Sequence, residues 1–282
     1  MKKKIRLVCK KEYEQSTCKI KECQEYLIDL LKSFQSFCDD YKIDCFLMFG
    51  TLLGSKREGK IIPWDDDLDM GILDNDFNRL RDNLIHLEKY GLSYYHYSNA
   101  KNCISNEIRI YRPGFYKLQE GSFKKNLWPV CIDIFLLNKV SDSVSEQDIK
   151  KCELKLNKQY FWLDKKEQRW KSKSKLKAFA LSCLRPFICS SCLHKKIDRI
   201  VAKMNRGGDY KYFIPDSVHD DGFIKFDPSY FQPLETTKFE DIVVKIPSKS
   251  EEILELLYGD WKTPYDRSEG KVFQKVFIDL RK

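Results

Sequence analysis

The stretch MFGTLLGSKREGKIIPWDDDLDMGI, residues 48–72, places four aspartates within five residues, directly after an apolar run and a glycine-rich turn. Four carboxylates this close repel one another, and a fold tolerates them mainly at an exposed turn or around a divalent cation. A calcium loop of the twelve-residue type is disfavoured, because the spacing lacks its glycine and its terminal glutamate. The four acids are Asp65, Asp66, Asp67 and Asp69.

The residues around the acids predict a strand, a short helix and a second strand. Residues 45–49, CFLMF, form a compact apolar run that ends at Gly50, which is typical of a buried strand. The next residues predict a tight turn into a short helix, and Pro63 ends that element. Residues 65–72 then predict the second strand.

Alternation along that second strand predicts a metal site. Asp65, Asp67 and Asp69 would lie on one face, whereas Asp66 would point away from them. Carboxylates at alternate positions can share one or two Mg²⁺ ions, because magnesium needs hard oxygen ligands and substrate phosphates commonly complete its shell. We therefore expect magnesium as the cofactor, with manganese as a possible substitute.

A second apolar run, IDIF at residues 132–135, contains a single acid, Asp133. A lone carboxylate there would be costly without a partner. If its strand lies beside the first, Asp133 can join the same cations, as in two-metal phosphoryl transfer. The alternative is a structural role, as a cap or as the ion-pair partner of an arginine.

The turn before the acids has the features of a phosphate site. Gly50 and Thr51 lie where a strand turns into a helix, so backbone N–H groups and the helix dipole can hold a phosphate. Gly54 permits close backbone approach. Lys56 and Arg57 then supply cations for a diphosphate, and arginine can bind it through two donors.

The composition indicates a folded chain with anionic partners. The 282 residues are 42% hydrophobic and 13% aromatic, which argues against disorder. The net charge of +9 is concentrated in three basic runs, at residues 2–11, 165–177 and 194–203. Such runs suit phosphorylated substrates, an acidic membrane surface or nucleic acid, and a solvated helix face is the simpler alternative.

The cysteines and the apolar segments indicate the cellular compartment of the protein. Eleven scattered cysteines are typical of reduced thiols in a reducing compartment, and the CxxC pair, Cys189 and Cys192, has no second pair at zinc spacing. The apolar run 5–9 is too short and too charged for a signal peptide. Residues 178–193 are too interrupted to span a membrane, but they could lie in its interface. We expect a cytoplasmic protein, with contact at the inner membrane face left open.

Strands bunched in the first half of the chain, followed by a lysine-rich helical stretch, predict an α+β fold with a mixed sheet core and an added helical region. We divide the chain into a catalytic core at residues 1–143, a basic helical region at 144–208 that could dock an acceptor or a membrane, and a C-terminal part at 209–282 that packs back on the core.

Four segments together resemble the LicD family, the phosphocholine-transferase group related to fukutin and fukutin-related protein. They are FGTLLGSKREGKIIPWDDDLDMGI, CIDIF, KFEDIVVKIP and LYGDWKTP. The resemblance implies a nucleotidyltransferase-like fold of the polymerase-beta type, in which a glycine turn precedes a DxD strand and a third acid lies on a neighbouring strand. On this chain those features are Gly50 and Thr51, Asp67 and Asp69, and Asp133, with Asp65 as a further magnesium ligand.

The resemblance also implies substrate contacts. Trp64 belongs to the PWDDDxD segment, and Arg109 is a candidate donor contact, although NEIRIYRPG departs from the basic pattern usual in the family. The closing YGDWKTP, residues 258–264, is expected either to position substrate or to complete the core. His219, in VHDDGF, fits no family motif, and a solvated loop is expected there.

The LicD-like activity moves a phosphorylated group such as phosphocholine from a CDP-linked donor, for example CDP-choline, to a sugar hydroxyl and releases CMP. The implied acceptor is a glycan or lipid-linked glycan of lipopolysaccharide or capsule biosynthesis, with no nucleic acid partner. Two rivals stay open. One is a nucleotidyltransferase that attaches a nucleotide to a hydroxyl, and the other is a non-catalytic nucleic-acid-binding protein, against which the four intact acids argue.

Overall fold

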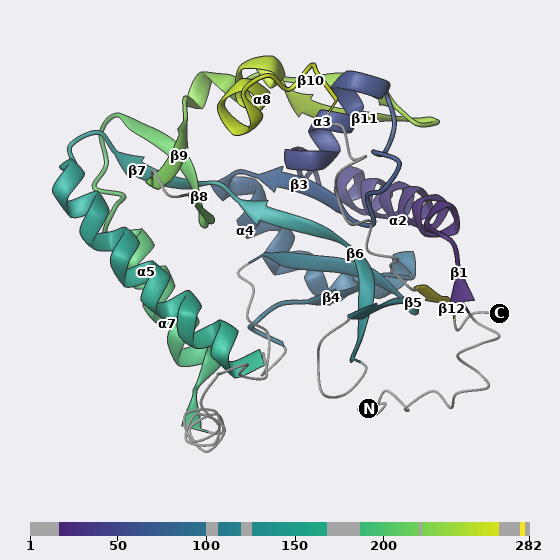
Figure 1. The fold of residues 1–282 in the computed structure, drawn as a ribbon, viewed down its shortest axis with the longest axis horizontal. Helices are drawn as coiled ribbons and strands as arrows, with labels where there is room; N and C mark the ends of the chain where they lie inside the picture. The colour runs from purple at the N-terminus through teal and green to yellow at the C-terminus, as the bar shows by residue number, and fades with distance from the viewer. Residues whose placement is uncertain are drawn as a thin grey trace.

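A computed structural model describes residues 17–99, 107–119, 126–167, 187–219, 222–264 and 277–279. Its centre is a seven-stranded sheet in the order β1-β12-β5-β6-β3-β2, with β4 paired to β5 (Figure 1). Strands β3 and β6 are parallel and the other pairs are antiparallel, so the sheet is mixed. The strands are β1 (Thr17–Cys18), β2 (Cys45–Leu47), β3 (Leu68–Ile72), β4 (Ser93–Tyr95), β5 (Ile108–Gln119), β6 (Asn126–Leu136) and β12 (Phe277–Asp279).

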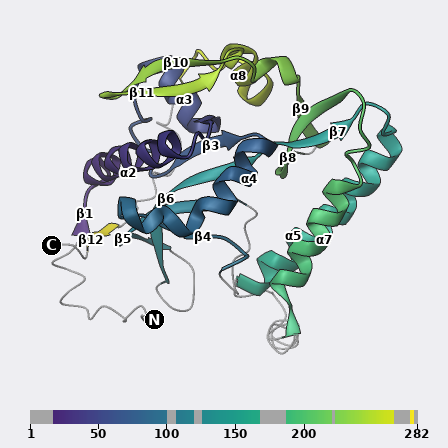
Figure 2. The ribbon, with the colours of Figure 1, turned by 180° about the vertical axis from the view of Figure 1, so that it is seen from behind.

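Two helices cover one face of this sheet: α2 (Ile20–Asp40) and α4 (Asp74–Asn83), which the 3₁₀ helix η1 (Leu84–Tyr90) continues (Figure 2). Apolar residues recur along α2 at steps of three and four, so one stripe of the helix is buried against the sheet. Alternate residues of β3 and β6, among them Leu68 and Ile132, belong to the same core. The other face of these two strands carries Asp69 and Asp133.

A sharp connection joins β2 to α3 (Phe49–Glu58) and brings this helix onto β3. Phe49 has a φ of 47°, a left-handed conformation that is uncommon for a bulky residue and marks strain at this turn. Gly71 of β3 lies against β2 so closely that a Cβ atom would be 2.4 Å from the Phe46 ring. The start of α3 is thereby held beside the residues that precede β3.

A second, smaller unit lies beside the carboxyl ends of β3 and β6. It contains a sheet of β7 (Asn138–Ser141), β8 (Tyr210–His219) and β9 (Gly222–Phe226), and a pair of helices, α5 (Glu146–Glu167) and α7 (Ser190–Ala202) (Figures 1 and 2). This smaller unit has a core of its own, formed by Val140, Val144, Ile149, Leu156, Leu193, Ile197, Met204 and Phe213. Most of the basic run 165–177 lies outside the described residues, and the three-part division of the chain stays a prediction.

Two expectations about this unit were wrong. Cys189 and Cys192 form a disulfide at the start of α7, although reduced thiols were expected throughout. His219 ends strand β8 and pairs with Gly222 in a hairpin, although a solvated loop was expected. Both errors concern contacts between residues three apart in the chain, and composition does not show whether such residues meet.

The C-terminal part contains η3 (Pro228–Tyr230), the hairpin β10 (Leu234–Phe239) and β11 (Ile242–Pro247), and α8 (Ser250–Tyr258). Helix α8 packs beside α3, and β11 lies against β2. Phe231, Phe239 and Trp261 are buried in the main core. In the described part of the chain, no helix combines the length and the apolar character needed to cross a bilayer.

Candidate active site

Asp69 and Asp133 lie opposite each other on neighbouring parallel strands. In the β3–β6 register Asp69 pairs with Asp133, and both point away from the face that α2 covers, because their sequence neighbours are buried in the core. The expectation that the strand of Asp133 lies beside that of Asp69 is therefore confirmed. Thr51 supports this arrangement, since its hydroxyl oxygen accepts a hydrogen bond of 2.8 Å from the backbone N–H of Asp69.

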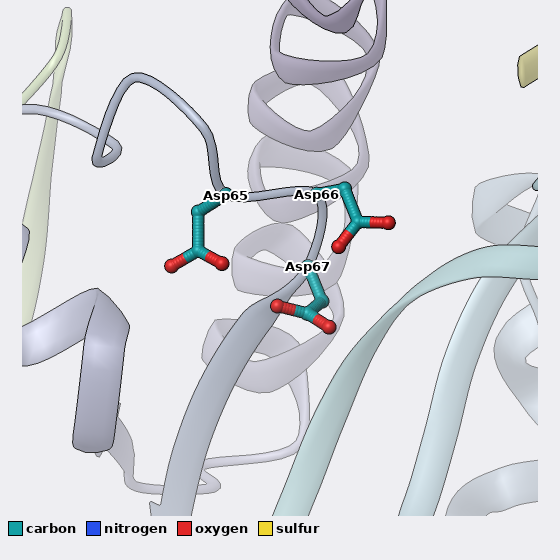
Figure 3. Close-up of side chains that lie close together, drawn as sticks. All are labelled: Asp65, Asp66 and Asp67. Atoms are coloured by element: carbon teal, nitrogen blue, oxygen red, sulfur yellow. The ribbon is translucent and has the colours of Figure 1, made fainter. Parts of the chain in front are cut away.

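The other three aspartates lie in the loop that leads into β3 (Figure 3). Asp65, Asp66 and Asp67 each present a carboxylate oxygen, and the three oxygens lie within 4.8 Å of one another. Gln24 of α2 holds this loop, because its side-chain amide donates hydrogen bonds of 3.0 Å to the carbonyl oxygens of Ile62 and Asp65. The loop is therefore anchored to the helix on the far side of the sheet.

The expected orientation of Asp66 was wrong. Strand β3 begins at Leu68, so the alternation of faces does not apply to residues 65–67. The side chain of Asp66 is 2% exposed, and its Oδ2 atom is 3.4 Å from Nζ of Lys117. Asp66 thus belongs to the carboxylate cluster instead of turning away from it.

Lys117 of β5 is a member of the site that the sequence did not reveal. Its Nζ atom lies 3.4 Å from Asp66 and 3.5 Å from Asp67. Burial by itself lowers the pKa of an amine, but the two aspartates outweigh it and the pKa of Lys117 is raised. The lysine therefore stays charged and offsets part of the negative charge of the loop.

Arg109 of β5 pairs with Asp133, which was the alternative left open for that acid. Its Nε atom donates to Asp133 Oδ1 at 3.2 Å, and Nη2 donates to Glu107 at 2.7 Å. The guanidinium also lies 5.4 Å from the centre of the Trp128 ring. Asp133 therefore has both expected neighbours, the acid of β3 and an arginine, and Glu107 is a second residue that sequence reasoning missed.

Burial makes the carboxylates of this face hard to ionise. It raises the pKa of Asp69 well above its usual range, and the charges of Asp67 and Asp133 add to the increase. Burial also raises the pKa of Asp133 to about 6, although Arg109 acts in the opposite direction. The neighbouring Cys131 has a raised pKa from the same burial, and its thiol lies 3.2 Å from Asp133. Negative charge is in excess here, since six described carboxylates lie around Lys117 and Arg109.

The candidate phosphate site lies at the first turn of α3, directly against the acids. A Cβ atom on Gly50 would lie 3.0 Å from Oδ2 of Asp65, so the glycine leaves room for this carboxylate. Glycine is needed at residue 54 because of a different contact: a Cβ atom on Gly54 would be 2.5 Å from the carbonyl oxygen of Lys60. The close approach expected at Gly54 is therefore made by the chain's own segment.

The expected cations are in the last turn of α3 and not at its first turn. Nζ of Lys56 is 3.9 Å from Glu251 of α8, and Arg57 is 3.4 Å from its neighbour Glu58. Trp64 is half-buried in the turn that precedes Asp65. These contacts place Lys56 at the boundary between α3 and α8.

The closing motif completes the core, which was one of its two expected roles, and the positioning of substrate stays a prediction. Trp261 is buried in the main core. Tyr258, at the end of α8, is partly exposed, and its pKa is raised by burial and by the charges of Asp69 and Asp65. Tyr258 thus lies near the acids, and the motif both completes the core and borders the site.

Comparison with known proteins gives two matches. Residues 42–150 match the family described as LicD/FKTN/FKRP, nucleotidyltransferase domain. A stretch of 63 residues is 36% identical to lipopolysaccharide cholinephosphotransferase LicD of Haemophilus influenzae, and it covers 22% of this chain and 24% of that protein. The match thus spans about a quarter of the relative's length. The matched stretch contains the acidic loop and both facing aspartates, so residues 42–150 are similar to the nucleotidyltransferase domain of the LicD/FKTN/FKRP family.

Proposed function

We propose that this protein transfers a phosphorylated alcohol, phosphocholine in the first instance, from a CDP-linked donor to a sugar hydroxyl of a cell-surface glycan or glycolipid and releases CMP. The observation that carries the proposal is the meeting of Asp69 and Asp133 on parallel neighbouring strands, beside the carboxylates of residues 65–67. The matched relative, named a lipopolysaccharide cholinephosphotransferase, supports the choice of group. The domain core is proposed to be nucleotidyltransferase-like.

The donor set fits magnesium. It consists of carboxylate oxygens, the three of the loop lie close enough to share one ion, and Asp69 adds a fourth carboxylate nearby. We propose Asp65, Asp67, Asp69 and Asp133 as the residues that hold Mg²⁺ or Mn²⁺, with Asp66 as an added candidate. When bound, the ions would neutralise the charge of the diphosphate and the charge that develops on CMP as it leaves.

The residues of the chain would then act on donor and acceptor. The acceptor oxygen forms a bond to the phosphorus of phosphocholine, the bond from that phosphorus to the CMP oxygen breaks, and CMP leaves. The hydroxyl proton passes to a carboxylate, for which Asp133 is the candidate because its pKa of about 6 suits a base near neutral pH. Arg109 would orient Asp133 through its 3.2 Å hydrogen bond.

The first turn of α3 is proposed to bind the diphosphate. The backbone of Gly50 and Thr51 offers the positive end of the helix dipole there. Lys56 and Arg57 would add charge from the same helix, and Trp64 would border the nucleotide. Because the Thr51 hydroxyl already binds the backbone of Asp69, its substitution should also disturb the acid.

Helices α5 and α7 are proposed to dock the acceptor. The exposed apolar side chains Leu154, Phe161 and Phe187 lie on or beside the lysine-rich helices α5 and α7. A basic surface with exposed apolar groups suits an anionic lipid-linked glycan at the inner face of the cytoplasmic membrane. Binding to anionic and neutral vesicles tests this docking, and equal binding to both would contradict it.

The rival within the same fold is nucleotide transfer, and the product distinguishes the two. Purified protein is incubated with Mg²⁺, a panel of CDP-linked alcohols and a sugar acceptor, and CMP is followed by phosphorus NMR beside the double variant Asp67→Asn, Asp69→Asn. Release of CMP from one donor, absent in the double variant, is the expected result. A product that retains the nucleotide would contradict the proposal, and so would CMP release that the double variant keeps.

A further inference from the structure

A cavity of about 250 Å³ lies where the carboxyl ends of β3 and β6 meet helix α7. Asp74 lies directly after β3, Leu136 ends β6, and the helix contributes Ile197 and Asp198. Figure 1 shows the α5 and α7 pair beside this end of the central sheet. The cavity is smaller than the pockets of drug-sized ligands, so it suits a small head group.

This cavity begins where the candidate active site ends. Phe135 lines it and lies two residues after Asp133 on the same face of β6. Glu107 also lines it, and accepts the 2.7 Å hydrogen bond of Arg109, whose Nε atom binds Asp133. Phe135 and Glu107 therefore connect the acids to the wall of the cavity.

The charges in its wall favour a cation over an anion. Asp74 is paired with Lys139 at 3.0 Å, and Glu107 is paired with Arg109. Asp198 accepts a 3.0 Å hydrogen bond from the Tyr97 hydroxyl, and among the described residues no lysine or arginine lies within ion-pair distance of it. Burial raises the pKa of Asp198 and the charge of the buried His194 acts to lower it, but in the described part of the chain this carboxylate has no lysine or arginine partner, and it would repel a phosphate.

Asp198 is held in place by an aromatic stack. The Tyr97 ring contacts His96, at 4.0 Å between ring centres and tilted, and His194, at 4.3 Å and nearly parallel. His194 is fully buried, and His96 accepts or donates a 2.9 Å hydrogen bond with Ser98. These ring contacts hold Tyr97, and its hydroxyl in turn positions the Asp198 carboxylate.

The remaining wall is apolar. Phe77 and Phe135 offer aromatic rings, and Ile197 and Val201 offer aliphatic surface. An ordinary ammonium ion keeps its hydration and gains little from such a wall, whereas a quaternary ammonium carries its charge under methyl groups and is attracted to aromatic faces. The combination of one carboxylate with apolar and aromatic surface therefore selects an alkylated cation.

We propose that this cavity, the head-group pocket, binds the quaternary ammonium end of the transferred group, with Asp198 as its counter-ion and Phe77 and Phe135 as its aromatic wall. The inference rests on the proposed function and deepens it, because it names the class of head group and the residues that select it. Tyr97 is a positioning residue, which acts through Asp198.

The test compares choline with its neutral isostere 3,3-dimethylbutan-1-ol by saturation-transfer NMR on the full chain. We expect choline to bind more tightly than the isostere, and the substitution Asp198→Asn to weaken choline about tenfold without weakening the isostere. Asp241→Asn, which removes an exposed carboxylate on the β10–β11 turn, is the matched control and should change neither affinity. Choline that binds no better than the isostere, or equally well to Asp198→Asn, would overturn the proposal.

A second variant fills the pocket without changing its charge. Ala202 lines the cavity at the end of α7, and Ala202→Phe should abolish choline binding. Choline binding that survives Ala202→Phe would place choline elsewhere and contradict the proposal. Binding that depends on Asp198, in a protein that releases no CMP from CDP-choline, would contradict the proposed function alone. Release of CMP from CDP-choline with an unchanged KM in Asp198→Asn would contradict the pocket alone.

Discussion

The acidic site and the head-group pocket both adjoin the β3–β6 pair, yet they are assembled differently. Five residues of a single segment supply four of the acids, and one neighbouring strand supplies the fifth. The pocket takes its wall from α4, the residues after β4, Glu107 before β5, the end of β6, β7, α7 and β8. The acidic loop needs only its own segment and one strand register, whereas the pocket also needs the helical pair to be placed correctly on the sheet.

The largest expected effect is on catalysis, and it distinguishes the acidic site from the head-group pocket. Asp69→Asn should lower turnover about 1,000-fold or more with every CDP-linked donor, because it removes a carboxylate from the centre of the cluster. Asp198→Asn should raise KM for a donor with a quaternary ammonium and leave donors with neutral head groups unchanged. Steady-state CMP release with both donor types checks this. Equal losses for the two donors in Asp198→Asn would remove the distinction.

The next effect concerns stability. Leu156 of α5 is fully buried in the small core, so Leu156→Ala should lower the free energy of unfolding by about 2–4 kcal/mol. Leu154→Ala, on the same helix but at an exposed residue, should change it by less than about 0.5 kcal/mol. Urea unfolding measures both.

Choline and Mg²⁺ titrations of Leu156→Ala under folding conditions then compare the two sites. Choline binding should weaken, because α7 packs on α5 and carries part of the pocket. Mg²⁺ binding should persist, because the acids belong to the main sheet. Loss of both would mean that the two regions do not act separately.

A smaller effect is expected at Lys117, whose charge lies where a divalent cation would also be attracted. Lys117→Met should bind Mg²⁺ about tenfold more tightly, because the acids lose an internal cation that competes with the ion. Lys32→Met, which removes an exposed ion pair, is the control and should leave Mg²⁺ affinity unchanged. Isothermal titration measures the constants. Weaker binding in Lys117→Met would show that the lysine supports the cation site.

The smallest effect is a pH dependence of stability without added metal. The pKa of Asp133 is raised to about 6 in the folded chain, so the folded state holds a proton that the unfolded state has released. The stabilisation from this group is present below the unfolded value near 4 and is lost as pH rises through about 6. Asp133→Asn should therefore melt a few degrees higher relative to wild type at pH 7.5 than at pH 4. A constant difference between the two would contradict the assignment.

Several features could be predicted from the sequence because they are local. The apolar residues between Ile20 and Phe37 recur at steps of three and four, which is the pattern of an amphipathic helix, and α2 spans Ile20–Asp40. Runs of apolar residues predicted β2 and the part of β6 that contains Asp133. The family motifs likewise lie within short segments. Spacing and side-chain type are enough for such features, since neighbours along the chain are neighbours in space.

Other features were decided only by the tertiary structure. Asp66 joined the cluster because β3 begins at Leu68, and no alternation rule reports where a strand begins. Lys117 and Glu107 reached the acids through the pairing of β5 with β6, and His96 met His194 through the packing of α7. The sequence alone determined which side chains are able to bind a cation or a phosphate. Which of them meet depends on long-range pairing and packing, because residues distant in the chain become neighbours only when the sheet and the helical pair are assembled.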